Sequence, residues 1–247
     1  MLPKTSVPES PLDLRPITVM SRIYRQWSRF KAVSLLVGLA SRVPNIIAGG
    51  TSTSSLMLSA HFQEILESEG SDSECNGVTI DIIKCYNVIP RYPLSLMMYK
   101  LGWPIPLIKT YMAVLMNLQR SFQTLGSVSS WQKSYTGVLE GCALAVASMY
   151  TLSSSLYYYL QETQETTPQA ELFTFADNWA LFFRQIAHTE SGVFFLEKFC
   201  SALKLAISVP KSWIWAINPE CFVSNLRTSG TQGCVIPTIK HTKDLWV

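Results

Sequence analysis

The chain has 247 residues, 48% of them hydrophobic and 15% charged, which is long enough for one large domain or two small ones with an ample core. The net charge is only +3, so a uniformly basic surface that attracts nucleic acid is excluded. Six cysteines without a C-x-x-C pair, and three scattered histidines, argue against a zinc site and fit a reducing compartment.

The N-terminal part combines a loose segment with a basic helix. Residues 1–13 contain proline and serine, are expected to be loose, and lack the apolar stretch of a secretory signal. Residues 17–40 predict a short strand end and then an amphipathic helix. Arg22, Arg25 and Arg29 share one helical face, while the opposite face carries Val19, Ile23, Trp27 and Phe30. A basic face of this kind either contacts phosphate groups or is simply solvated.

The next elements are a capped helix and a strand with an acid in it. A glycine-, serine- and threonine-rich loop precedes a helix at about 54–68, and a strand is predicted at about 77–84. Val78, Ile80, Ile82 and Ile83 are typical of a buried strand, yet Asp81 lies among them. Such local inconsistency often marks a functional site, although an Asp paired with a nearby Lys or Arg is the alternative.

Helices dominate the middle of the chain. Segments 92–101 and 105–117 predict helices, residues 119–135 a β-hairpin, and block 136–145 leads into a long helix that ends near 161. The uncharged stretch 141–160 raises the question of a membrane span. Its serine, threonine and tyrosine content predicts a buried helix instead.

A second acidic site follows the polar linker 161–170. Residues 173–183, FTFADNWALFF, predict a strand, a tight turn and a second strand, with Asp177 and Asn178 at the tip. A buried carboxylate costs several kcal/mol unless it is paired or holds a cation, whereas an ordinary surface turn is the simpler interpretation. If Asp81 and Asp177 converge, they make a divalent-cation site. A further helix is expected at about 189–203, and the alternation of strands and helices predicts an α+β fold.

Six blocks in order resemble a reverse transcriptase of the non-LTR retroelement type. The first four resemble the fingers block, the first palm aspartate block, the Gly-x-Pro-Gln-Gly block and the Tyr-x-Asp-Asp block. The last two resemble the following lysine-containing block and the start of the Tyr-Leu-Gly-Val block. In this chain the six are LRPITVMSRIYRQWSR (14–29), VTIDIIKCYN (78–87), TGVLEGCALA (136–145), FADNW (175–179), LKLAISVPKSWIW (203–215) and TIKHTKDLWV (238–247).

The resemblance implies a right-hand polymerase palm, with an antiparallel sheet packed on helices. Residues 14–76 would form partial fingers and 77–237 the palm, with a finger insertion at about 92–135. Residues 238–247 would begin the palm/thumb junction, so that the thumb is expected to be missing and the chain to be part of a longer polyprotein.

The resemblance also implies the metal ligands. Asp81, the backbone carbonyl of Ile82, Asp177 and Asn178 would hold Mg²⁺ for two-metal phosphoryl transfer. Asn178 stands where a second Asp is usual. An amide oxygen brings no charge, so weaker metal binding and a preference for Mn²⁺ are expected.

Substrate contacts are implied as well. Arg15 would pair with the triphosphate, and Tyr86 would exclude the 2′-hydroxyl unless it is an ordinary core tyrosine. Gly141 would allow close backbone approach beside the nascent base pair. Glu140 replaces the usual Gln, which is unfavourable next to a nucleotide. Lys211 would protonate the departing pyrophosphate.

The implied function is RNA-directed DNA polymerase activity, which adds deoxynucleoside triphosphates to a DNA primer on an RNA template. The alternatives are a catalytically impaired remnant that only binds nucleic acid, favoured by Glu140, Asn178 and Trp246, and a nucleotidyl cyclase. No membrane association is expected, and an integrating eukaryotic element implies action in the nucleus. The three tryptophans Trp179, Trp213 and Trp215 are expected to pack in the core rather than to stack on bases.

Overall fold

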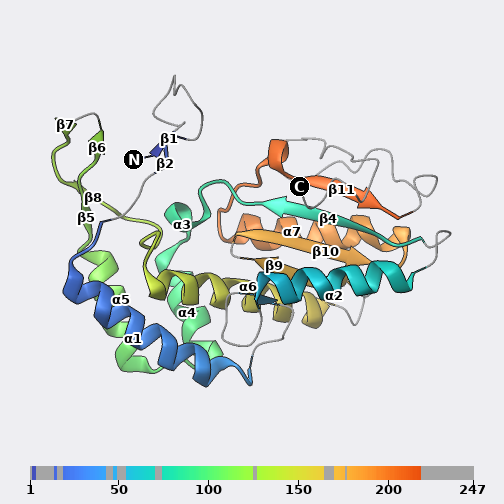
Figure 1. The fold of residues 1–247 in the computed structure, drawn as a ribbon, viewed down its shortest axis with the longest axis horizontal. Helices are drawn as coiled ribbons and strands as arrows, with labels where there is room; N and C mark the ends of the chain where they lie inside the picture. Colours follow the sequence, from blue (N-terminus) through green and yellow to red (C-terminus); the bar gives the residue numbers. More distant parts are fainter. Residues whose placement is uncertain are drawn as a thin grey trace.

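The computed structural model describes residues 2–3, 14–15, 19–42, 47–48, 54–69, 74–124, 127–163, 170–175 and 177–217. Their centre is a five-stranded sheet with the order β11-β4-β10-β9-β3 (Figure 1). Strands β9 and β10 form an antiparallel hairpin, β4 pairs with β10, β11 pairs with β4, and β3 runs parallel to β9. The strands are β3 (Ile47–Ala48), β4 (Asn76–Asp81), β9 (Ala170–Phe175), β10 (Asn178–Phe183) and β11 (Trp213–Ala216).

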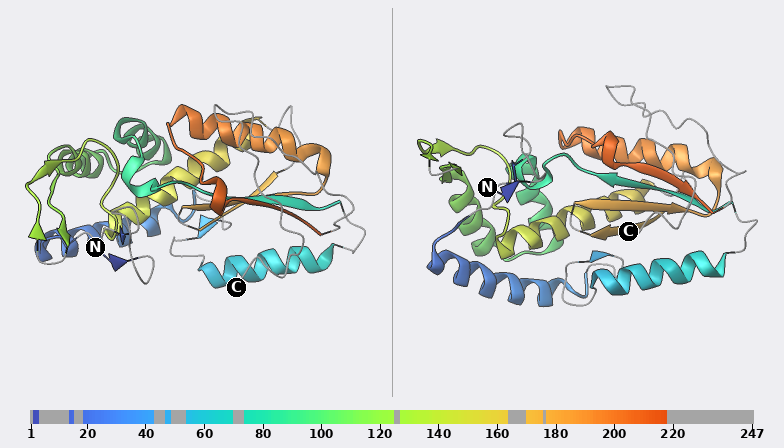
Figure 2. Two further views of the ribbon diagram at one scale, coloured as in Figure 1. Left: turned by 90° about the horizontal axis from the view of Figure 1, so that it is seen from above. Right: turned by 45° about the horizontal axis from the view of Figure 1, so that its top comes forward.

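Helices cover both faces of this sheet. Helix α2 (Ser55–Ser68) lies on one side and α7 (Thr189–Ala202) on the other (Figure 2). The long helix α6 (Ala143–Thr163) packs with α7 in the larger core. Alternation along β4 places Val78 and Ile80 in that core, so Thr79 and Asp81 point to the face that α2 partly covers. The Asp81 carboxylate therefore does not lie on the face of β4 that packs in the core.

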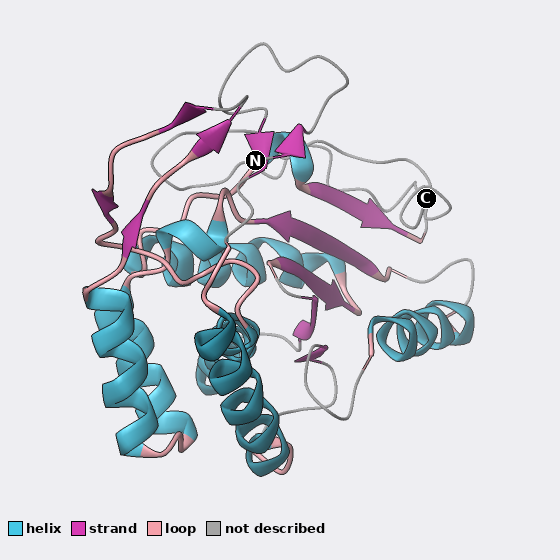
Figure 3. Ribbon diagram, turned by 60° about the vertical axis from the view of Figure 1, so that its left-hand side comes forward, coloured by secondary structure: helices cyan, strands magenta, loops and turns pink. Residues whose placement is uncertain are grey.

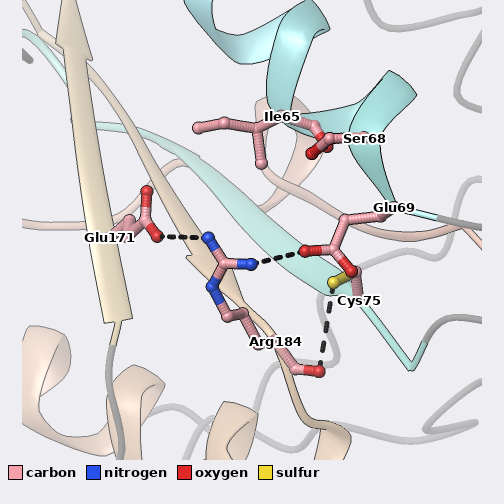
Figure 4. A network of polar contacts seen from close by, with 6 residues as sticks. All are labelled: Ile65, Ser68, Glu69, Cys75, Glu171 and Arg184. Atoms are coloured by element: carbon pink, nitrogen blue, oxygen red, sulfur yellow. Dashed lines mark hydrogen bonds and ion pairs between the residues drawn. The ribbon is translucent and has the colours of Figure 1, made fainter.

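Arg184, directly after β10, fastens α2 to the sheet. Its guanidinium forms ion pairs with Glu69, which caps α2, and with Glu171 of β9 (Figure 4). The carbonyl oxygen of Arg184 accepts a hydrogen bond from the Cys75 thiol at 3.9 Å. On the same face, Phe62 of α2 packs edge-on against the aromatic rings of three strand residues, Phe173, Phe182 and Trp215. These contacts hold α2 over the sheet at the end away from Asp81.

A helical layer and a hairpin made of two short strand pairs lie beside the sheet. Helices α1 (Arg22–Leu39) and α4 (Arg91–Leu101) pack on α6, and α5 (Ile105–Met116) packs on α4. The strand pairs β5–β8 and β6–β7 lie apart from the five-stranded sheet (Figure 3). Their bounds are β5 (Gln119–Arg120), β6 (Gln123–Thr124), β7 (Ser127–Val128) and β8 (Gln132–Lys133), and a further pair joins β1 (Leu2–Pro3) to β2 (Leu14–Arg15).

The predicted α+β class is confirmed, and most predicted helices agree with the structure to within a few residues. The strand predicted at 77–84 is the main exception, because β4 ends at Asp81. Lys84 adopts a left-handed conformation with φ of 49°, and the short helix α3 (Cys85–Val88) begins after it. A left-handed residue that is not glycine is costly, and such residues concentrate at functional turns.

Helix α1 uses a different face from the one its pattern suggests. Its buried residues are Ser28, Ala32, Leu35 and Leu39, whereas Val19 and Ile23 are 90% and 81% exposed. Of the apolar residues opposite the arginines, Trp27 packs against the core, whereas Val19, Ile23 and Phe30 are exposed.

The uncharged helix at 141–160 is buried in the fold, as expected for α6. Within the described residues, no helix combines the length and apolarity that crossing a bilayer requires. Trp179 and Trp215 are fully buried, in line with core packing, while Trp213 is half-buried.

Several predicted features lie outside the described residues. These are most of the loose segment 1–13, most of the linker 161–170, the side chain of Arg15, and the block 238–247 with Trp246.

Candidate active site

Asp81 and Asp177 come from neighbouring strand ends. Asp81 is the last residue of β4, and it lies directly opposite Asn178, the first residue of β10. Asp177 immediately precedes Asn178, in the turn between β9 and β10. Residues opposite each other in an antiparallel pair have Cα atoms about 4.5–5.5 Å apart. Two segments almost a hundred residues apart in the chain thus place Asp81, Asp177 and Asn178 at neighbouring strand ends.

The charge of Asp81 acts on the carboxyl group of Asp177. The pKa of Asp177 is raised, chiefly by burial and further by the negative charge of Asp81, while its own backbone hydrogen bond and Lys211 oppose the shift. A carboxylate that is partly desolvated beside a like charge favours either a proton or a bound cation. The site therefore has the electrostatics of a cation-binding pair.

Lys211 provides a nearby positive charge. Its Nζ lies 3.4 Å from Oδ2 of Asp81, and it belongs to the 3₁₀ turn η3 (Val209–Lys211). The residues that flank this turn are hydrogen-bonded to the backbone of Asp81. Ser208 N–H donates to the Asp81 carbonyl at 2.8 Å, and Asp81 N–H donates to Ser212 Oγ at 3.3 Å. Lys211 is thus placed by backbone contacts and not by the ion pair alone.

A further backbone hydrogen bond orients the carbonyl of Ile82. The N–H of Ile83 donates to Ala206 O at 2.8 Å, on the η3 side of β4. In a trans peptide, the C=O of one residue points opposite to the N–H of the next. The Ile82 carbonyl therefore points away from Ala206, toward the side on which β10 and Asp177 lie.

Tyr86 lies close to this group. It belongs to α3, is half-buried, and its pKa is raised to about 12, mainly by burial and also by the negative charges of Asp177 and Glu140. Its phenol is therefore within the electrostatic influence of both the carboxylate pair and the loop before α6. Its contact with a sugar stays a prediction.

The loop before α6 is fixed against α3. Val138 N–H donates to Tyr86 O at 2.6 Å, and Gly137 N–H donates to Ile89 O at 2.9 Å. Gly137 has φ of 73°, and a Cβ there would meet carbonyl atoms of Asn87 and Tyr86 at about 2.5 Å. Glycine is required at this position because no side chain fits.

Gly141 differs from Gly137 in its surroundings. Its φ is 87°, and a Cβ added there would meet no atom within 4 Å. The space beside it is open, as the prediction of close approach by a ligand requires, while Glu140 next to it is partly exposed.

Sequence reasoning missed the residue that holds this loop. Arg91, buried at the start of α4, donates to the carbonyls of Gly137, Ser134 and Thr136 at 2.7–2.8 Å. An arginine after Pro90 gives no signal that its partners lie about 45 residues later.

Beneath Asn178, the α2 face of the sheet continues as a cavity of about 390 Å³. Among the residues that the structure describes, its lining includes Leu58, Phe62, Trp213 and Trp215 and no charged residue.

The donor set fits a divalent cation. Carboxylate, amide and carbonyl oxygens are the ligands that Mg²⁺ and Mn²⁺ use, and the repulsion felt by Asp177 is what a cation relieves. The set contains only two acids, and no cluster of three or more His, Cys, Asp or Glu suited to a metal occurs in the part of the chain that the structure describes. The Asp at the usual position of Asn178 would have supplied the third.

Comparison with known proteins places the chain in a family. A telomerase from Candida tropicalis, truncated from its C-terminal domain, matches with a TM-score of 0.50 at 12% identity over 77% of this chain. The match covers 39% of the telomerase chain, so this protein spans well under half of that length. At this identity the likeness concerns the fold alone, and it agrees with a polymerase palm. No curated protein matches. The family model for reverse transcriptase (RNA-dependent DNA polymerase) matches residues 2–230, and the chain therefore belongs to the reverse transcriptase family.

Proposed function

We propose that this protein is an RNA-directed DNA polymerase of a non-LTR-type retroelement. It extends a DNA primer on an RNA template with deoxynucleoside triphosphates. The observation that supports the proposal is the position of Asp81 and Asp177 at adjacent strand ends, where the charge of Asp81 raises the pKa of Asp177. Residues 14–76 then serve as partial fingers and 77–237 as the palm, and an integrating element of a eukaryote acts in the nucleus.

The metal ligands are Asp81, Asp177, the amide oxygen of Asn178 and the carbonyl of Ile82. Bound Mg²⁺ or Mn²⁺ supplies the charge that lowers the pKa of the primer hydroxyl and stabilises the leaving pyrophosphate. Asn178 leaves the site one negative charge short of three carboxylates, which favours Mn²⁺ over Mg²⁺ because Mn²⁺ binds such ligands more tightly.

The remaining residues bind and orient the substrates. Arg15 binds the triphosphate through its guanidinium group, and the ring of Tyr86 excludes the 2′-hydroxyl. Lys211, held beside Asp81, donates a proton to the pyrophosphate. The turn at Glu140 and Gly141 borders the base pair that is being formed.

A primer-extension assay tests the proposal. The protein is given an RNA template annealed to a DNA primer, the four deoxynucleoside triphosphates, and either Mg²⁺ or Mn²⁺. Extension that is lost in Asp81→Asn and in Asp177→Asn, and is kept in the control Glu64→Gln on the exposed side of α2, supports it. Extension that persists in both Asp variants overturns it, as does a complete lack of extension with either metal.

The sugar preference gives an independent measurement. Tyr86→Ala is expected to incorporate ribonucleotides, whereas Tyr86→Phe keeps the ring and is expected to exclude them. An unchanged preference in Tyr86→Ala removes that role from Tyr86.

A further inference from the structure

Helices α1 and α2 lie end to end along one outer edge of the molecule. Both views in Figure 2 show α1, drawn in blue, followed along this edge by α2, drawn in cyan. Each helix buries its inner side, α1 through Leu35 and Leu39 and α2 through Phe62 and Ile65. The outer sides of Arg22–Leu39 and Ser55–Ser68 face solvent, and together they are called the α1–α2 ridge below.

Apolar side chains follow the ridge and gather where α1 ends and α2 begins. Those on α1 are spaced by seven, three and four residues, which is the pattern by which one helix packs against another. Single exposed apolar residues are normal, whereas a row that keeps its spacing and continues on a second helix indicates a protein contact. The row consists of residues that are 55–81% exposed: Ile23, Phe30, Val33, Val37, Leu56 and Met57.

The two ends of the ridge carry opposite charges. Arg22 and Arg29 flank the apolar row in the first half of α1, a helix without any acidic residue. Glu64 and Glu67 lie in the second half of α2, a helix without lysine or arginine. The order along the ridge is therefore basic, apolar and acidic, which is complementary to itself when the ridge is turned end for end.

These charges are not used within the described part of the chain. Neither arginine forms an ion pair there, and neither glutamate meets a lysine or an arginine. Glu64 has only Nδ1 of His61 at 3.7 Å, and Glu67 accepts a hydrogen bond from Gln63 at 2.8 Å. Both charged ends are thus available to a second molecule.

The spacing of the charges suits a two-fold axis. The arginine pair is centred about 20 Å before the end of α1, and the glutamate pair about 16 Å after the start of α2. An axis between the two helices therefore brings the arginines of one copy opposite the glutamates of the other, twice in each dimer. A different partner would have to repeat this order of charges in reverse, and an anionic membrane surface would be repelled by Glu64 and Glu67.

The area of the ridge is sufficient for a reversible dimer. Together α1 and α2 present about 48 Å of helix axis, and a helix is about 10 Å wide. Two copies would cover about 1,000 Å² in total, which is the lower limit of specific protein interfaces. The expected dimer therefore dissociates at low protein concentration.

We propose that the α1–α2 ridge binds a second copy of this chain, with α1 of each copy antiparallel to α2 of the other. The apolar residues pack about the two-fold axis, and Arg22 and Arg29 of each copy face Glu64 and Glu67 of the other. This proposal does not depend on the polymerase proposal, because it uses neither the carboxylate site nor a nucleic acid.

Sedimentation velocity over a series of micromolar protein concentrations tests the dimer, without metal or nucleic acid. The acidic variant carries Arg22→Glu and Arg29→Glu, and the basic variant carries Glu64→Lys and Glu67→Lys. Exposed ion pairs are individually weak, so the loss of all four arginine–glutamate contacts is expected to raise the dissociation constant of each variant by about tenfold. A mixture of the two variants is expected to dimerise like wild type, because both contacts across the axis are complementary again.

The mixture also guards against misfolding, since unfolded variants would not restore each other. Arg22→Glu puts an acid at the start of α1 and Glu67→Lys a base at the end of α2, and both changes suit the helix dipole. The control Lys100→Glu with Lys198→Glu, at exposed sites outside the ridge, is expected to leave the dissociation constant unchanged.

A second pair of variants tests the apolar part. Phe30→Ser with Val37→Ser is expected to abolish dimerisation. Tyr92→Ser with Tyr99→Ser, which removes equally exposed rings from α4, is expected to keep it.

Each outcome decides the proposal. A wild type that stays monomeric, a dimer that survives both charge reversals, or folded variants whose mixture does not associate would overturn it. Dimerisation as expected in a protein that extends no primer supports the ridge and ends the polymerase proposal. Primer extension by a protein that is always a monomer has the opposite consequence.

Discussion

Replacing Asn178 by aspartate restores a third carboxylate at the strand ends, and its effect can be worked out from the sheet register. Asn178 faces Asp81 across β4 and β10 and follows Asp177. At about 5 Å, two unit charges repel by about 0.8 kcal/mol in water and by about 3.3 kcal/mol at an effective dielectric constant of 20. Asn178 is exposed, so the lower value applies to each neighbour. Asn178→Asp is therefore expected to destabilise the metal-free protein by about 1–2 kcal/mol.

A bound cation relieves this repulsion, and the relief increases the affinity of the site for the cation. Thermal unfolding in EDTA is expected to show a Tm lower than that of wild type by about 2–8 °C for a chain of this size. Added Mg²⁺ is expected to reverse the difference, because the extra carboxylate becomes a ligand. About 1.4 kcal/mol of relieved repulsion corresponds to about tenfold tighter Mg²⁺ binding.

The controls separate ligation from screening. Asn178→Ser removes the amide without adding charge and is expected to weaken metal binding. Titration with NaCl at matched ionic strength shows how much of the recovery in Tm is due to general screening of charge. If Asn178→Asp and wild type have the same Tm in EDTA and the same Mg²⁺ titration, residue 178 does not face the carboxylates and the charge argument fails.

Three other substitutions test the frame around the site. Gly77→Ala would place a Cβ 2.3 Å from the Trp215 ring, and urea denaturation is expected to show a loss of about 1–3 kcal/mol from overpacking. Arg91→Leu leaves the carbonyls of the loop before α6 without their donor, and a loss of about 2–4 kcal/mol is expected, with Arg91→Lys intermediate. The raised pKa of Asp177 means that its contribution to stability is present below the ordinary carboxyl pKa and is lost as pH rises through the raised value. Asp177→Asn in EDTA is therefore expected to be more stable than wild type at neutral pH and equal to it in acid, as measured by Tm across pH.

The hairpin with Asp177 could be predicted from the sequence because its signal is local. Two apolar runs around an Asp–Asn pair specify a strand, a turn and a strand, and β9 and β10 pair as that pattern requires. The strand with Asp81 was also predictable. The end of this strand was not predictable. The chain turns after β4 through Lys84 in a left-handed conformation, and this position lacks the glycine or asparagine that would signal such a turn.

The interpretation of Asp81 as an acid inside a buried run changes with the structure. Val78 and Ile80 point to one face, and Thr79 and Asp81 point to the other. Alternation with a period of two removes the inconsistency, since a run of β-branched residues need not be buried on both faces. The sequence alone does not show which strand lies beside which. The register of β4 on β10, and the partners of Arg91 and Lys211, depend on contacts between segments that are far apart in the chain.

Lys211 and Asn178 both make the metal site less negative than three carboxylates would. The size of each effect on metal affinity decides which residue matters more. With Lys211 paired to Asp81, two carboxylates and one ammonium leave a single net negative charge. The Lys211 side chain is 71% exposed, so its ion pair is worth about 0–1 kcal/mol. Lys211→Gln is therefore expected to tighten Mg²⁺ binding by no more than about fivefold, less than Asn178→Asp. If Lys211 also donates the proton to pyrophosphate, the same variant is expected to lower kcat while it improves metal binding, as measured by single-turnover extension across Mg²⁺ concentrations. A variant that gains affinity and keeps kcat would show that Lys211 only balances charge, because a proton donor cannot be removed without slowing the step that uses it.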